Sequence, residues 1–312
     1  GIEMSKKNKE IARDAEANRS ESRGVSKIGI SDIIIMLVLG ILSISCILPF
    51  IHIAAKSISG KAAVLGKEVF FWPKDINFDA YVTIFNDGQL THAMGYTVKL
   101  TLIFTILGMI VCTCAAYPLS KKRLKGREFI SVILLLSMYF SAGLIPEYLI
   151  MKKLGLLNTM WALIWPLIFS PYNMLIMKSY LQSTIPDSLE ESAFLDGATN
   201  FQVLWKIVIP LSKPIIATLS LFYAVGRWNA YADAKYYVFR ERALQPLQYI
   251  LSNMILSSGQ DAISIQEGSL AANTPEVIQA AAIMFVTIPI ICIYPFVQKY
   301  FVKGAMIGAV KG

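Results

Sequence analysis

The chain has 312 residues, of which 55% are hydrophobic and 16% are charged, and its mean hydropathy is +0.55. This composition excludes an ordinary soluble domain and is typical of a membrane protein. The net charge of +8 is compatible with nucleic acid, but the cations stand beside hydrophobic segments, as they do in membrane proteins. We therefore expect the lipid bilayer, and no nucleic acid, as a partner.

The N-terminal part of the sequence predicts a polar tail and then a membrane span. Residues 1–29 are rich in charged residues, Ser and Asn, which predicts a loosely ordered cytoplasmic tail. The run from Ile33 to Ala55 has no formal charge and is long enough for the roughly 20 residues that cross a bilayer. It lacks a small-x-small cleavage site, so we expect a span and not a secretory signal.

The next connection, residues 56–95, contains glycines and a lysine that are spaced almost as in a nucleotide-binding loop. A Walker A loop needs four residues between its glycines, and Ser or Thr after its Lys. Here five residues separate Gly60 from Gly66, and Glu68 follows Lys67. We therefore expect no bound cofactor and no ATPase site in this chain.

Further apolar segments bring the prediction to six transmembrane helices in an all-α integral membrane protein with a permease domain over residues 30–300. These segments are 100–120, 129–151, 154–177, 207–227 and 277–298; Gly143 and Pro146 are expected to break the segment 129–151, and the segment 154–177 contains Pro166 and Pro171. In the segment 100–120, Gly108, Cys112 and Ala116 form a stripe of small residues, which lets membrane helices pack closely. The cysteines all lie in apolar runs and predict neither a disulfide nor a metal site; they are Cys46, Cys112, Cys114 and Cys292.

The positions of the cations predict the orientation of the six spans, because Lys and Arg gather on the cytoplasmic side. A run of Lys and Arg precedes the first span, the segment Lys121–Arg127 is the densest basic loop, and lysines follow the sixth span. Both termini and the loop Gln182–Pro210 are thus expected in the cytoplasm, with segments 56–95 and 231–276 outside. Lys152 and Lys153 disagree, since they fall in a short outer loop.

The polar stretch from Gln182 to Pro214 predicts two short helices joined by a glycine turn. Pro186 suits the start of a helix, and acidic residues crowd the first turn, where the helix dipole favours anions. Gly197 predicts a left-handed stop. Thr199 and Gln202 have the spacing of a capping box, so a second helix is expected to begin there and to run into the fifth span.

This stretch resembles the cytoplasmic EAA loop of permease subunits in binding-protein-dependent ABC importers. The matching residues are Glu191-Ser192-Ala193, Asp196-Gly197-Ala198 and Ile207-Val208-Ile209-Pro210, with Ser192 and Ile209 as conservative departures. Within that group, residues 30–312 are similar to the MalG-like subunits of oligosaccharide importers. The residues that carry this likeness are Trp72-Pro73-Lys74, Gly143-Leu144-Ile145-Pro146, Leu154-Gly155-Leu156, Trp228-Asn229 and the tail Lys299–Gly312.

The resemblance implies a type I ABC importer permease fold in the bacterial cytoplasmic membrane, and a transport subunit that is not itself an enzyme. The implied partners are a second homologous permease, two copies of a cytoplasmic ATPase that uses ATP and Mg²⁺, and an extracellular binding protein. Residues 182–206 would couple the chain to the ATPase, and the tail 301–312 either reaches the same interface or is a frayed end. The expected coupling residues are Glu190, Glu191, Ser192, Ala193, Asp196, Gly197, Ala198 and Pro210, with Glu190 or Glu191 paired to cations of the ATPase.

A sugar pathway needs aromatic rings for the apolar faces of the sugar, and amides or carboxylates for its hydroxyls. The candidates are Tyr139, Phe140, Glu147, Trp165, Asn173, Trp228, Asn229 and Tyr231. Each of them can instead belong to the interfacial aromatic belt or to packing of the bundle. In segment 231–276 the apolar residues Leu247, Ile250, Leu251, Met254 and Ile255 recur at helical spacing. They predict a helix that caps the bundle or receives the binding protein.

Other interpretations remain open at this point. A permease for peptides or amino acids would carry the same loop, since only the subfamily likeness favours sugar. A secondary transporter needs an ionisable residue at mid-membrane, whereas Lys99, Glu147, Lys213 and Arg227 are expected near span ends, where they can snorkel. A membrane enzyme is disfavoured, because the sequence has only 2 His and neither H-E-x-x-H nor G-x-S-x-G.

Overall fold

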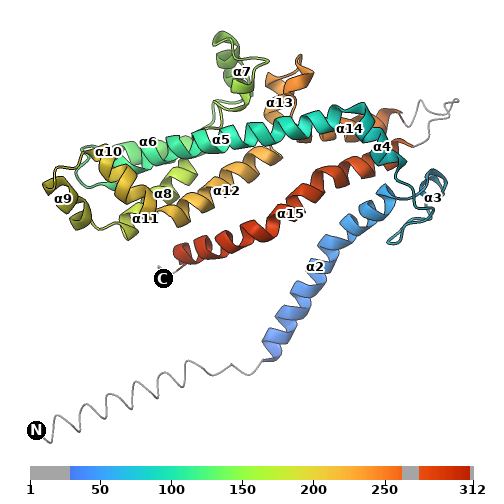
Figure 1. Cartoon of the computed structure of the whole chain (residues 1–312), viewed down its shortest axis with the longest axis horizontal. Coiled ribbons are helices and arrows are strands. Elements are labelled where there is room, and N and C mark those ends of the chain that lie inside the picture. Colours follow the sequence, from blue (N-terminus) through green and yellow to red (C-terminus); the bar gives the residue numbers. More distant parts are fainter. Residues whose placement is uncertain (1–28, 262–273, 310–312) are drawn as a thin grey trace, which may run out of the picture. The chain divides into compact units, whose positions relative to one another are not determined.

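The computed structural model describes residues 29–261 and 274–309, and all regular elements in these ranges are helices (Figure 1). The chain divides into two compact units, and the boundary between them falls between residues 52 and 53. The predicted tail at residues 1–29 lies, apart from Gly29, outside the described residues. So do residues 262–273 of the predicted outer segment and residues 310–312 of the predicted C-terminal tail.

The first unit contains most of α2, which runs from Ile30 to Ser57 and includes the predicted span 33–55. Its large side chains from Ile30 to Phe50 are exposed and apolar on every side. A helix that is apolar all round belongs in lipid or in a large core. α2 is long and apolar enough to cross a membrane, which agrees with the prediction.

The second unit is helical in its described part as well. Its segments in chain order are α3 (Lys61–Leu65), α4 (Asp79–Asp87), α5 (Gln89–Ser120), α6 (Arg127–Tyr139), α7 (Leu144–Lys153), η1 (Met160–Leu163), α8 (Pro171–Thr184), α9 (Asp187–Leu195), α10 (Asn200–Val203), η2 (Leu204–Val208), α11 (Ile209–Leu211), α12 (Lys213–Asn229), α13 (Ala232–Tyr237), η3 (Arg242–Leu244), α14 (Leu247–Asp261) and α15 (Pro275–Ala309). Of the segments named η, η2 is a π-helical turn and the others are 3-10 turns.

α5 is the central helix of this unit, and α8, α12, α4 and α14 pack against it. Figure 1 shows α9 and α10 near one end of α5, and α4 and α14 near the other. The predicted small-residue stripe of Gly108, Cys112 and Ala116 is buried. A Cβ on Gly108 would lie 2.8 Å from Cε1 of Tyr223 in α12. The two helices therefore approach more closely than any side chain at residue 108 would permit.

The predicted break in the third span at Gly143 is confirmed, whereas the fourth span differs from the prediction. Residues 129–151 do not form one helix, because α6 and α7 meet at a bend of 111°, and Gly143 adopts a φ of +89° there. Within residues 154–177, a continuous α-helix begins only at Pro171. Ser170 caps α8 by accepting a hydrogen bond from the Asn173 N–H, and a proline cannot sit inside a continuous helix without removing a donor. A continuous fourth helix over 154–177 is therefore wrong.

The second, fifth and sixth spans differ mainly in their bounds. α5 begins at Gln89, inside the predicted connection 56–95. The fifth span is interrupted at Ser212, where residues 200–211 and α12 meet at an angle of 82°. Pro214, in the first turn of α12, has no N–H to continue the preceding helix across this point. α15 extends to Ala309 and includes most of the predicted tail 301–312.

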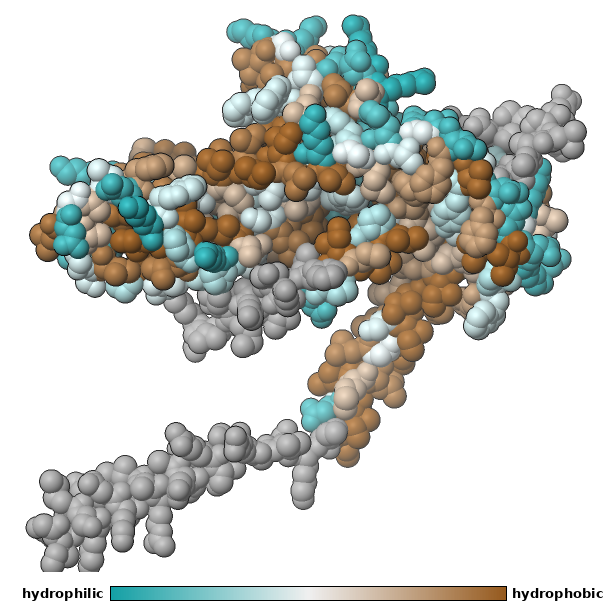
Figure 2. Space-filling view, in the orientation of Figure 1, coloured by the Kyte–Doolittle hydropathy of each residue, from teal (hydrophilic) through white to brown (hydrophobic). Residues whose placement is uncertain are grey.

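In the described residues, 3 helices are long and apolar enough to cross a membrane, or up to 5 if each bent pair forms one span. The regular structure of residues 29–261 and 274–309 is thus entirely helical, and several of its helices are long and apolar enough to cross a membrane. Figure 2 shows apolar side chains along the middle of the second unit, and hydrophilic ones over α7 and α13 and near both ends of α5. The helix predicted around Leu247 is present as α14, with Leu247, Ile250 and Leu251 buried.

Candidate functional site

The polar stretch after α8 folds into the two helices that the sequence predicts. α9 begins directly after Pro186, and α10 begins directly after Thr199. The Thr199 hydroxyl oxygen accepts a hydrogen bond from the Gln202 N–H, and Gln202 Oε1 accepts one from the Thr199 N–H. This reciprocal pair is the predicted capping box, so side chains fix the start of α10.

Gly197 ends α9 in the left-handed conformation, with a φ of +82°. Its N–H donates to the Phe194 carbonyl at 3.0 Å, and the Ala198 N–H donates to the Ala193 carbonyl at 2.9 Å. The two bonds make a Schellman motif, in which glycine is favoured because it has no Cβ. The bend between α9 and α10, residues 196–199, is named the elbow. Backbone hydrogen bonds set its geometry.

Glu190 of α9 is buried against the end of α5. Its Oε1 lies 2.7 Å from Nζ of Lys121, and its Oε2 accepts a hydrogen bond from the Tyr117 hydroxyl at 3.4 Å. Asp187 Oδ1 lies 3.7 Å from the same Lys121 nitrogen. The side chains of Lys121 and Glu190 are 6% and 4% exposed, so water screens this ion pair poorly. The pair ties α9 to α5.

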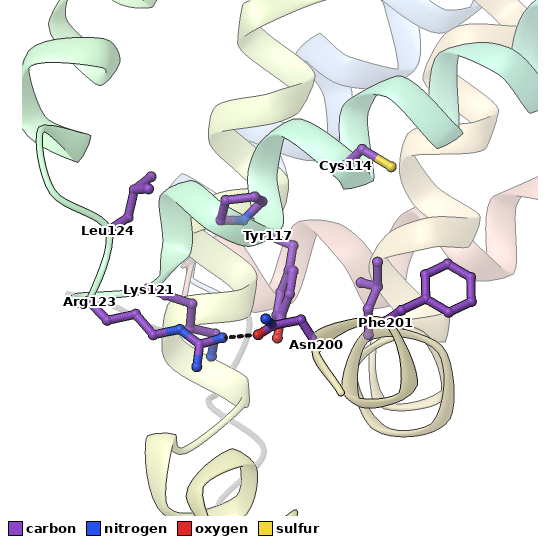
Figure 3. Close-up of a pocket in the computed structure, with 9 residues that line it drawn as sticks. Cys114, Tyr117, Lys121, Arg123, Leu124, Asn200 and Phe201 are labelled. Atoms are coloured by element: carbon purple, nitrogen blue, oxygen red, sulfur yellow. Dashed lines mark hydrogen bonds between the residues drawn. The ribbon is translucent and has the colours of Figure 1, made fainter. Parts of the chain in front are cut away.

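Arg123 makes a second connection between the basic loop and the helix pair. Its guanidinium lies 4.7 Å from the centre of the Phe194 ring and donates to Asn200 Oδ1 at 2.8 Å (Figure 3). Loop residues 121–126 and the elbow therefore lie at the same end of the bundle. Because they are in contact, both lie on the same side of the membrane, in agreement with the pattern of cations.

The other predicted coupling residues stay at or near the surface. Ala193 and Ala198 are half-buried; the exposed members of the set are Glu191, Ser192, Asp196, Gly197 and Pro210. The Ser192 hydroxyl donates to the Ser188 carbonyl within α9. The exposed face of α9 also carries the side chains of Asp187 and Leu195. An acidic face of this kind is complementary to a cationic groove on another protein.

Sequence reasoning missed the residues that hold the elbow. Tyr117 and Glu190 are 73 positions apart, and no local pattern connects them. The available signal was indirect: the loop Lys121–Arg127 and the acidic helix were predicted on the same side of the membrane. That prediction permits an ion pair between them but does not select Lys121 or Glu190 as its members.

The substrate-pathway candidates are not gathered into one site. Tyr139 and Phe140 are exposed at the end of α6, and Trp165 stands beside Trp161, with ring centres 6.2 Å apart. Asn173 is buried in α8, where a packing role suffices. The remaining aromatic and amide candidates lie around the end of α12: Trp228 packs half-buried near α14 and α15, whereas Asn229 and Tyr231 are exposed.

Glu147 lies close to Tyr237 of α13. Burial first, and then the carboxylates of Glu147 and Asp233, raise the pKa of the Tyr237 hydroxyl. Tyr237 therefore keeps its proton at neutral pH and can donate it in a hydrogen bond. This pairing links α7 to α13 and gives Glu147 a partner inside the protein.

Arg227 differs most from its predicted setting. The sequence suggested a snorkelling cation at a span end, but Arg227 is 1% exposed. Its guanidinium donates two hydrogen bonds to the Asp233 carboxylate and one to the Leu163 carbonyl at 2.8 Å. A buried guanidinium requires such charged and polar acceptors. Arg227 thus joins α12 to α13 and η1 at the end of the unit away from the elbow.

The fold agrees with comparisons to known proteins. Residues 95–306 match the family described as binding-protein-dependent transport system inner membrane component, and the chain belongs to this family. It is a multi-pass protein of the bacterial cytoplasmic membrane. The predicted resemblance to permease subunits of ABC importers is therefore confirmed.

Particular relatives extend this result over nearly the whole chain. Protein LplC of Bacillus subtilis (strain 168) is 40% identical over 281 residues, which cover 90% of this chain and 95% of that protein. The polygalacturonan/rhamnogalacturonan transport system permease protein YtcP of the same organism is also 40% identical over 281 residues, with 89% and 98% covered. A chain of a bacterial ABC transporter involved in the import of the acidic polysaccharide alginate superposes with a TM-score of 0.79 at 35% identity, and covers 87% of this chain and 96% of its own length.

Proposed function

We propose that this chain is one of two permease subunits of an ABC importer that carries an oligosaccharide or a polysaccharide fragment. Its partners are a second homologous permease, two copies of a cytoplasmic ATPase and an extracellular solute-binding protein. The ATPase uses ATP and Mg²⁺, and this chain contributes half of the pathway. Membership in the importer family supports the proposal, as do the carbohydrates named for its relatives.

The observation that carries the coupling role is the anchored elbow. α9 presents exposed acidic side chains on one face, while its buried face is held to α5 by the Lys121–Glu190 pair. A helix that transmits force must be accessible to its partner and rigidly attached to the membrane helices, and α9 meets both conditions. Because Glu190 has an internal cation, Glu191 is the better candidate of the two for a cation of the ATPase.

Two routes lead from α9 into the membrane domain. The chain itself continues through α10, η2 and α11 to α12, and the Lys121–Glu190 pair connects α9 directly to α5. α5 and α12 pack closely at Gly108, so a displacement of α9 acts on both helices together. A difference of about 5.5 kcal/mol in binding energy between two states is enough to shift their ratio from 1:99 to 99:1. Closure of the ATPase dimer supplies such a difference.

The proposed topology has six spans and both termini in the cytoplasm. α2, α5 and α15 supply three spans, and the bent pairs α6–α7 and 200–229 supply two more. The sixth must then consist of the irregular segment 154–170 followed by α8. An interrupted span of this kind is tolerated where its backbone is buried in protein, and Ala162, Leu163 and Ile164 are fully buried.

Transport by the reconstituted complex tests the proposal. The complex of both permeases and the ATPase is placed in proteoliposomes with the binding protein, and uptake of labelled oligogalacturonate, alginate oligosaccharides, neutral oligosaccharides and peptides is compared. We expect ATP-dependent uptake of at least one glycan, and loss of that uptake in Glu191→Lys. Uptake of peptides and of no glycan would show that the chain belongs to a permease for peptides or amino acids. Uptake driven by an ion gradient without ATP would overturn the coupling role.

A further inference from the structure

A pocket of about 520 Å³ lies beside α10 and shares Tyr117 and Lys121 with the contact that holds α9. It is formed by the last turns of α5, by residues 121–124 and by α10, and is named the α5–α10 pocket. Cys114, Pro118, Leu124, Phe201 and Leu204 give it a mainly apolar wall. Figure 3 shows Lys121 and Arg123 on one side of it, with Cys114 and Phe201 on the other.

The pocket lies at the boundary between the membrane and the water. α5 is a membrane-crossing helix, and the basic loop Lys121–Arg127 follows its last residue. Short basic loops between spans stay at the level of the lipid headgroups on the cytoplasmic side. The exposed rings of Phe201 and Trp205 stack beside the pocket with their centres 6.3 Å apart, and exposed aromatic rings favour the same depth.

The lining of the pocket contains two cations, Lys121 and Arg123, and no carboxylate; Asp187, Glu190 and Glu191 line an adjoining hollow that both cations also border. Lys121 is neutralised by Glu190, but the partners of Arg123 are neutral: the amide of Asn200, the ring of Phe194 and the hydroxyl of Tyr117. In the described ranges of the chain, no carboxylate forms an ion pair with Arg123. An apolar wall below a guanidinium that has no ion-pair partner matches an acyl chain below a phosphate.

We propose that the α5–α10 pocket binds an anionic phospholipid, with one acyl chain along the apolar wall and the headgroup phosphate on Arg123. Basic pockets at the cytoplasmic ends of membrane helices recognise anionic headgroups in this way. An apolar side chain from the second permease could fill the wall but would leave Arg123 without an ion-pair partner. A lipid in this position also packs between α5 and α10, and so supports the elbow from its membrane side. The orientation of the pocket rests on the proposed function.

Cys114 reports on occupancy, because it is exposed on the pocket wall whereas Cys112 is buried. In the assembled complex with Cys46 and Cys292 of this chain replaced by Ser, the rate of maleimide labelling at Cys114 is read by mass spectrometry. We expect dioctanoyl phosphatidylglycerol to slow this labelling, and dioctanoyl phosphatidylcholine to have little effect. Arg123→Ala should weaken the protection about fivefold, the effect of one cation at a membrane surface. The matched control is Lys125→Ala, in the same loop but outside the pocket, which should change it little.

Leu124→Trp gives a second, independent readout, because it fills the wall and keeps every charge of the loop. Native mass spectrometry of the complex should show phosphatidylglycerol retained in the parent and lost in this variant. Equal protection by both lipids would overturn the proposal. The proposal would also be overturned if Cys114 reacted with maleimide in the isolated chain but not in the lipid-depleted complex. That result would show that the second permease covers the pocket. None of these measurements depends on the transported solute, so a wrong substrate class would leave their outcome unchanged.

Discussion

At the scale of single residues, the attachment of α9 depends on the buried pair of Lys121 and Glu190. Lys121→Met leaves the Glu190 carboxylate without its cation in a site where it is 4% exposed. Removing one member of a buried pair costs about 3–5 kcal/mol, whereas removing both can be nearly neutral. We expect Lys121→Met to lower the thermal midpoint of the complex clearly, and the addition of Glu190→Gln to recover most of the loss.

The control for this pair is Lys122→Met, which removes an exposed cation from the same loop. Exposed substitutions of this kind change the free energy of unfolding by about 0.5 kcal/mol or less. The same variants should be assayed for ATP-dependent uptake, because a loose α9 transmits less force to α5. If the double variant lost as much stability as the two single variants together, Lys121 and Glu190 would not act as a pair.

Arg227 supports a second prediction at this scale, at the opposite end of the unit. Its guanidinium meets Asp233 with two parallel hydrogen bonds and also reaches the Leu163 carbonyl. A lysine ammonium cannot reproduce this planar geometry, so Arg227→Lys should lower the free energy of unfolding by about 2–3 kcal/mol. Arg240→Lys, at an exposed position, is the control in the same thermal-unfolding measurement. Equal midpoints for the two variants would contradict the role of the buried network.

At the scale of helices, the contact between α5 and α12 depends on the absence of a side chain at residue 108. A Cβ there would lie 2.8 Å and 2.9 Å from two ring carbons of Tyr223, and that ring is buried. Gly108→Ala must therefore displace the ring or separate the helices, at a cost of about 1–3 kcal/mol. Gly95→Ala in the same helix meets nothing within 4 Å and should be neutral or slightly stabilising. Thermal unfolding of both variants decides whether the close approach is required.

The elements that could be predicted from the sequence are those that neighbouring residues determine. Pro186, Gly197 and the Thr199–Gln202 pair act within one turn of the chain, so the two ends of α9 and the start of α10 could be predicted from the sequence. Hydropathy also located the apolar segments, because it sums composition over a window. Gly143 and Pro146 indicated the break in the third span, but hydropathy does not register direction, so the bend angles of 111° and 82° were not predicted. The residues at these two bends, Gly143 and Pro214, are visible in the sequence, but the angles are not.

The contacts that hold the elbow could not be predicted for a different reason. The Lys121–Glu190 pair and the Arg123–Asn200 hydrogen bond join residues far apart in the sequence, and several cations of the basic loop were equally plausible partners. The choice among them is made by the packing of α5 beside α9. Arg227 was misplaced for the same reason, since its acceptors come from α13 and η1 and not from its own helix.

At the scale of the whole molecule, the remaining question is which side of the membrane each segment faces. The structure reduces this question to a single choice, because the basic loop and α9 are joined by an ion pair and must lie on one side together. The density of cations in Lys121–Arg127 predicts that this side is the cytoplasm. In the proposed topology, three spans between α4 and α9 place segment 56–95 on the other face, and α12 returns the chain to that face before segment 231–276.

Single cysteines in a chain without its native cysteines test this arrangement in intact cells. We expect Thr83→Cys in α4 and Glu241→Cys, both at exposed positions, to react with an impermeant maleimide added outside. Ser5→Cys and Glu191→Cys should react only after the membrane is permeabilised, which also shows that each thiol is competent. Labelling of Glu191→Cys from outside would show that the orientation is the reverse of the proposed one. Because the Lys121–Glu190 ion pair joins α9 to the basic loop, that loop would then also lie outside. The acidic face of α9 would then be out of reach of any cytoplasmic ATPase, and the coupling role would have to be abandoned.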